Sequence, residues 1–153
     1  MESPIEQLDR IKRSFDKIKD NKNRVLEDYK DDLYHFFQDC WHLKDWIRNY
    51  PTLDKNKKDI ENKVENSTYI KICSDIANRT KHFQLNGTGT GRVNGKIEKI
   101  NTNITLGTHT SKGHGELIAK VKTESTCIDA IELAEKAIEE WEGILKTYDF
   151  KST

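Results

Sequence analysis

The sequence predicts a mainly α-helical single domain, residues 1–153, with one β-hairpin inserted before the last helix. Three observations lead to this fold class. Apolar side chains recur at helical spacing through most of the chain, whereas alternation of apolar and polar residues is confined to about 92–123. Hydrophobic and charged residues each make up 34% of the chain, which fits a small core wrapped by long, charged helices. A length of 153 residues suits one domain.

The first two helices have clear start and stop signals. Ser3 can cap a helix that has Pro4 at its first position and Glu6 completing a capping box. A polar break follows, and a second helix is predicted from about 24 to 49. Pro51 ends it, because the residue before a proline is pushed out of the helical region.

Three further helices complete the predicted set. A short helix ends near Asn66, and Ser67 or Thr68 can cap the next one. The last helix follows the hairpin, and Ser125 or Thr126 is predicted to cap it.

The hairpin is predicted to span about 92–123. Residues 107–115 are interpreted as its loop and residues 116–123 as the return strand. Because a lone hairpin is marginal in water, we expect it to pack against the bundle or against a second copy of the protein. The apolar side chains expected to do so are Val93, Ile97, Leu117 or Val121.

Charge is balanced overall but uneven along the chain. With 26 basic and 26 acidic residues the formal net charge is zero, which argues against a protein that coats nucleic acid. From 79 to 122, however, eight basic residues stand against two acidic ones. This region is either a solvated face that attracts the acidic segment 123–149 or a surface that contacts a phosphate backbone. The candidate binding residues for the second interpretation are Lys81, Arg92 and Lys96.

Compartment and cofactors are predicted from what the sequence lacks. Its three cysteines are far apart and form no CxxC pair, which favours a reducing, cytoplasmic location. No stretch approaches transmembrane length, so no membrane association is expected. His109 and His114 have no thiol or carboxylate at ligand spacing, so we expect no metal and no cofactor.

One polar segment lies in the second helix, at residues 40–46. His42 and Asp45 are three residues apart and share a helix face. A second polar segment, residues 75–82, begins at Asp75. Because an unsatisfied buried polar group costs about 1–3 kcal/mol, we predict that His42, Asp45 and Asp75 meet in a structural cluster between two helices.

The second segment also carries candidate chemistry. Arg79 and His82 are three residues apart, and Asn78 lies four before His82. Arginine and histidine together suit phosphodiester cleavage, because imidazole can move a proton and guanidinium can hold an anionic transition state. The alternative is that these groups only complement the negative end of the helix dipole.

The two segments together resemble a group of small bacterial and phage proteins that pair His-x-x-Asp-Trp with Asp-x-x-Asn-x-x-Lys-His, a group similar to the HEPN superfamily. The likeness covers residues 33–83. The resemblance implies an up-and-down four-helix bundle. Many members are metal-independent ribonucleases whose arginine and histidine come from both protomers of a dimer, and others bind RNA or protein partners. It assigns the catalytic role to His82, with Arg79 and Asn78 as its partners.

Three functions remain open from the sequence. The first is a HEPN-like interaction or RNA-binding module in bacterial or phage defence, acting as a homodimer or with an RNA or protein partner. The family spaces its arginine and histidine more widely than Arg79 and His82, so a toxin-type, metal-independent endoribonuclease is the alternative. A structural subunit of a larger assembly is the third.

Overall fold

The computed structural model describes residues 3–50, 57–85, 103–111, 114–123, 127–148 and 150 of the chain, with the backbone alone at 57, 79–85, 103–111 and 114–115. It is mainly helical with a hairpin before the last helix, as predicted. None of the helices it describes is long and apolar enough to cross a membrane. The elements in chain order are α1 (Pro4–Lys19), α2 (Leu26–Arg48), α3 (Lys57–Glu65), α4 (Tyr69–Leu85), β1 (Asn103–Ser111), β2 (His114–Lys122), β3 (Cys127–Asp129) and α7 (Ala130–Leu145).

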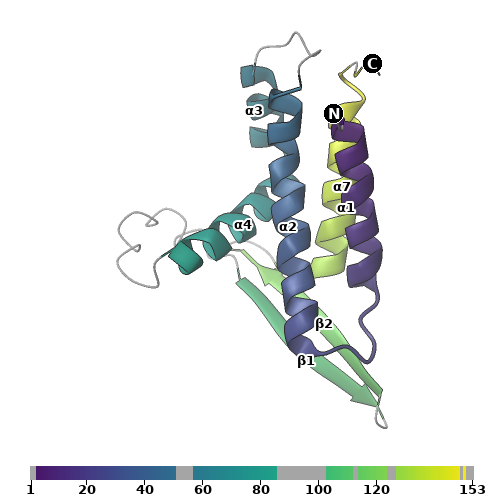
Figure 1. Ribbon diagram of the computed structural model, residues 1–153. Coiled ribbons are helices and arrows are strands. Elements are labelled where there is room, and N and C mark those ends of the chain that lie inside the picture. Colours follow the sequence, from purple (N-terminus) through teal and green to yellow (C-terminus); the bar gives the residue numbers. More distant parts are fainter. Residues whose placement is uncertain are drawn as a thin grey trace.

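Three long helices form the bundle. Figure 1 shows α1, α2 and α7 side by side, whereas α4 crosses α2 obliquely. In the core, the indole nitrogen of Trp141 in α7 donates to the backbone oxygen of Cys40 in α2 at 2.8 Å. The expected four-helix up-and-down arrangement is not confirmed. α3 has only nine residues, too few to run the length of the bundle, so α4 begins partway along α7, at Glu140.

The ends of α1 are satisfied by side chains. At its start the predicted capping box is confirmed, because Ser3 Oγ accepts from the Glu6 amide at 3.2 Å and Glu6 Oε2 accepts from the Ser3 amide at 2.6 Å. At its end the hydroxyl of Tyr29 in α2 donates to the backbone oxygen of Ile18 at 2.9 Å. Arg24, in the α1–α2 connection, pairs with Asp32 of α2. These contacts fix the turn between the two helices.

The sheet has the order β1-β2-β3 and is antiparallel. β1 continues to Ser111, which pairs with His114, so the interpretation of residues 107–115 as a loop is wrong. Threonines at 105, 108 and 110 favour extended backbone, and the ladder is made by backbone groups, so the glycine at 107 does not end the strand.

One face of the sheet packs on the bundle. Leu117, Ala119 and Val121 alternate along β2 and are buried in the common core, beside α7. The expectation that the hairpin packs against the bundle is therefore confirmed for Leu117 and Val121. Val93 and Ile97 lie outside the described residues.

The last helix begins later than predicted. Residues 127–129 pair with the end of β2 as a third strand, and α7 starts directly after them. Its cap is Asp129, whose Oδ2 accepts from the amides of Ile131 and Glu132 at 3.1 Å each. The predicted caps, Ser125 and Thr126, lie outside the described residues. Pairing with β2 keeps the chain extended as far as a residue that is itself a strong helix cap.

Candidate functional site

The candidate site is built on α4, and a carboxylate from another helix fixes the start of α4. Glu140 of α7 accepts hydrogen bonds from three successive amides, those of Thr68 at 2.9 Å, Tyr69 at 2.8 Å and Ile70 at 2.9 Å. A negative charge at this end is also favoured by the helix dipole. The cap is thus supplied by Glu140 rather than by the Ser67 or Thr68 side chain that the sequence predicted. The Ser67 hydroxyl donates instead to the backbone oxygen of Val64 at the end of α3.

The first half of α4 is anchored by apolar packing. Ile70, Cys73 and Ile76 are buried in the core cluster, mainly against α2 and also against α7. Burial raises the pKa of the Cys73 thiol, and its hydrogen bond with Cys40 adds to the effect. Since the thiolate is the reactive form, burial holds Cys73 in the unreactive thiol form, and its role is in packing.

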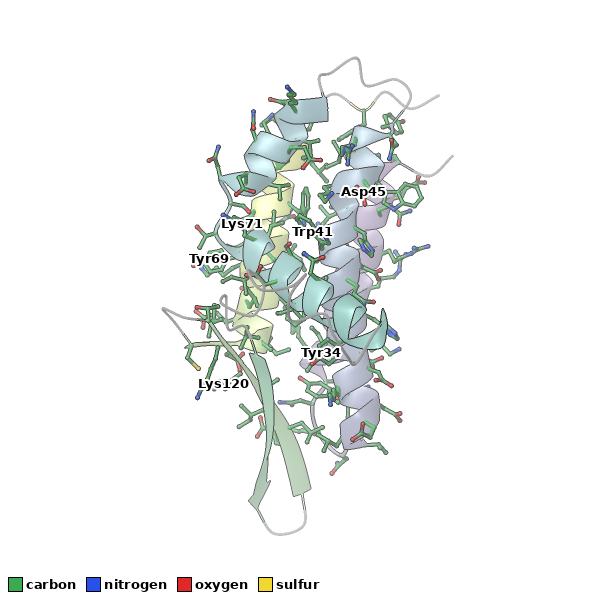
Figure 2. All side chains as sticks on the ribbon, turned by 90° about the vertical axis from the view of Figure 1, so that its left-hand side faces the viewer. Tyr34, Trp41, Asp45, Tyr69, Lys71 and Lys120 are labelled. Atoms are coloured by element: carbon green, nitrogen blue, oxygen red, sulfur yellow. The ribbon has the colours of Figure 1, made fainter. Side chains whose placement is uncertain are left out.

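Aromatic side chains flank α4. Figure 2 shows α4 crossing α2 between Trp41 and Tyr34, two residues of α2 that are each partly buried. Tyr69, in the first turn of α4, is partly buried as well. The Lys44 ammonium lies 4.7 Å from the centroid of the Trp41 ring, in cation–π contact. The face around α4 therefore combines incompletely buried rings with a lysine that is also paired with a carboxylate, Asp45.

The cluster of His42, Asp45 and Asp75 stays a prediction, and the groups that the structure places near Asp45 are basic. Asp45 lies 3.2 Å from the Lys44 ammonium and 3.7 Å from the Arg48 guanidinium. His42 is exposed on α2, while Asp75 is partly buried on α4.

The carboxylate beside His42 is Asp39, one turn earlier in α2. Burial raises the pKa of the Asp39 carboxyl, and the charges of Arg10, His42 and His35 partly offset this. Asp39 follows His35 by four residues and precedes His42 by three, so helical spacing alone could have indicated this cluster.

The candidate catalytic residues lie on the second half of α4. Asn78 is partly buried and donates to Ser74 Oγ at 3.3 Å. Arg79, Lys81 and His82 follow on the same helix, which runs to Leu85, so their predicted helical spacing is confirmed. The backbone alone is described at these three positions. The candidate binding residues Arg92 and Lys96 lie outside the described residues.

Two further findings bear on the site. Within the described part of the chain, no group of three histidine, cysteine, aspartate or glutamate residues is placed to hold a metal ion. The chain matches no protein-family model, no curated protein and no solved structure. The site must therefore be interpreted from its own residues.

Proposed function

We propose that this chain is a HEPN-like module that binds a partner, RNA by preference, through the second half of α4. The observation that carries the proposal is the course of α4. Its first half is buried against α2 and α7, and in Figure 1 its second half points away from the bundle. That second half carries Arg79, Lys81 and His82, which follow the buried Ala77 along the helix.

The surroundings of α4 favour RNA over other anionic partners. Single-stranded nucleic acid is bound by cations that contact phosphates together with aromatic rings on which bases stack. Tyr34, Trp41 and Tyr69 are partly buried rings around α4, and Figure 2 shows them on the face that also carries Lys71 and Lys120. Because the net charge of the chain is zero, such binding depends on this local surface rather than on the protein as a whole.

The test is fluorescence anisotropy with a labelled single-stranded RNA across a range of salt concentrations. For the double variant Arg79→Ala with Lys81→Ala we expect weaker binding and a salt dependence whose slope falls by about 0.7 for each phosphate contact removed. The matched control is Lys30→Ala, an exposed cation on α2, which should leave affinity and slope unchanged. Tyr34→Leu keeps an apolar side chain but removes the ring, and should weaken binding with little change in slope.

A second measurement separates binding from cleavage. Labelled RNA is incubated with wild type and with His82→Ala, each with and without EDTA. The module proposed here binds RNA and leaves it intact. Cleavage that resists EDTA and is lost in His82→Ala supports the endoribonuclease instead, because removing a general acid or base costs about 10²–10⁴-fold in rate. RNA that is neither bound nor cut supports a protein-interaction or structural role.

A further inference from the structure

The outer edge of β1 has no strand beside it in the described part of the chain. β2 is the interior strand, because β1 pairs along one of its edges. β3 pairs with the other edge at 120–122, and the α1–α2 connection contacts that edge through a bridge between Lys22 and Glu116. β1 has β2 alone as its partner among the described residues, and Figure 1 shows it as the outermost strand of the sheet.

The contacts of β2 show which backbone groups of β1 point outward. The Leu117 amide donates to the backbone oxygen of Asn21 at 2.9 Å, and the Leu117 carbonyl accepts from Asn21 Nδ2 at 2.9 Å. Both groups of Leu117 therefore point away from β1. In an antiparallel ladder, pairs of opposite residues that hydrogen-bond to each other alternate with pairs whose backbone groups point away from each other. Leu117 lies opposite Thr108, so Thr108 and every second residue of β1 direct their amide and carbonyl groups outward: Ile104, Leu106, Thr108 and Thr110.

The sequence of β1 does not protect this edge. Edge strands of monomeric proteins are commonly blunted by charged residues, especially lysine, or by proline. Across its nine residues, 103–111, β1 has no lysine, arginine, aspartate, glutamate or proline. The covered interior strand has charges instead, at Glu116, Lys120 and Lys122. Charges on the edge strand would keep it from pairing, but here the charges lie on the interior strand and the edge strand has none.

We propose that β1 pairs antiparallel with β1 of a second copy, making one continuous sheet across a two-fold dimer. A two-fold interface is isologous, which means that both copies contribute the same surface, so two identical strands can pair with each other. With the axis at Gly107, glycine faces glycine and Thr105 faces His109 of the second copy. Within each copy, Lys120 lies opposite Thr105 and His109 lies opposite Glu116. Each row of residues across the four strands can therefore be followed, and the row that begins at Lys120 ends at Glu116 of the second copy. No row places like charges side by side. The same axis sets Leu106 opposite Thr108 of the second copy, so the outward amide and carbonyl groups of the two strands meet, which favours a second copy as the partner.

The test is sedimentation velocity of the full chain over a range of concentrations. We expect a dimer in the wild type. Thr108→Pro removes one outward amide from each copy and leaves the ladder with β2 intact, so the dissociation constant should rise on the order of thirtyfold. Thr108→Val keeps the amide and is the matched control. Gly107→Lys places two ammonium groups opposite each other at the axis and should also dissociate the dimer, while the neutral Gly107→Gln should not.

A second readout shows whether the edge itself is involved. In hydrogen exchange, the amides of Leu106 and Thr108 should be protected in the dimer and lose protection on dilution, while the circular dichroism of the helices stays constant. A wild-type monomer at every concentration tested overturns the proposal. So does a dimer that Thr108→Pro and Gly107→Lys leave unchanged while both variants remain folded.

Discussion

The three-helix bundle and the region formed by α4 and the sheet are held in different ways. In the bundle, large side chains such as Phe36, Phe37 and Trp141 are fully buried, and the polar indole among them is paired. α4 and the hairpin also have an apolar inner face, and polar anchors from other elements add to it, Glu140 at the start of α4 and Asn21 at the edge of β2. We infer that the bundle supplies most of the stability and the second region most of the binding surface.

The largest effect is expected in the centre of the bundle. Trp141→Ala removes a fully buried indole together with its hydrogen bond to Cys40, and should lower the free energy of unfolding by about 3–5 kcal/mol. Trp46→Ala is the control, because that side chain is 37% exposed, and its cost should stay below about 1 kcal/mol. Urea titration followed by circular dichroism measures both. Similar losses for the two variants would contradict the assignment of stability to the bundle core.

A smaller and more local effect is expected at the anchor of α4. Glu140→Ala leaves three amides at the start of the helix without their acceptor and should cost about 1–2 kcal/mol. Its neighbour Glu139 is exposed, so Glu139→Ala should change stability by less than about 0.5 kcal/mol. Hydrogen exchange should show faster opening of α4 than of α2 in the Glu140 variant. Uniform acceleration in both helices would mean that α4 and the bundle unfold as one unit.

The sequence predicted the elements better than their arrangement. Caps made by neighbouring residues, such as Ser3 with Glu6, can be recognised because both partners lie within one turn. The cap of α4 could not be found in this way, because Glu140 lies some seventy residues along the sequence from the amides whose hydrogen bonds it accepts. The oblique course of α4 was missed for the same reason, because hydrophobic periodicity indicates a buried face but not the helix it packs against.

The candidate site was predicted in part. The helix that carries Asn78 to His82 was recognised from its apolar spacing, and the structure confirms that helix. The influence of His42 on Asp39 was not predicted, although Asp39 lies three residues before His42 on the same helix. Spacing of three or four residues identifies several candidate neighbours, and only packing against α1 selects among them.

The turn between α1 and α2 provides a pH-dependent test. Burial alone would raise the pKa of Asp32, but its hydrogen bond with Arg24 and the charges of Lys17 and Arg24 lower it below the ordinary value of 3.8. The carboxylate therefore stabilises the fold above that value, and the contribution is lost as the pH falls through the lowered pKa. Asp32→Asn should cost about 1–2 kcal/mol near neutral pH, with the loss shrinking in acid. Asp31→Asn, exposed on the same helix, is the control, and equal pH profiles for the two variants would contradict the pairing.

The smallest effect is expected at Asp39, and it has the opposite sign. Burial raises the pKa of this carboxyl above 3.8 despite the nearby Arg10, His42 and His35. Between the ordinary and the raised value the folded protein binds more protons than the unfolded chain, so its stability contribution falls as the pH rises through this window. Asp39→Asn removes that dependence and also the attraction to Arg10, and the two consequences oppose each other near neutral pH. We therefore expect a change below about 1 kcal/mol at pH 7, and a stability of the variant that rises relative to that of the wild type as the pH increases just above 3.8. Unfolding titrations at several pH values measure this difference. A variant that instead loses stability relative to the wild type as the pH rises would mean that the positive groups, rather than burial, govern this carboxylate.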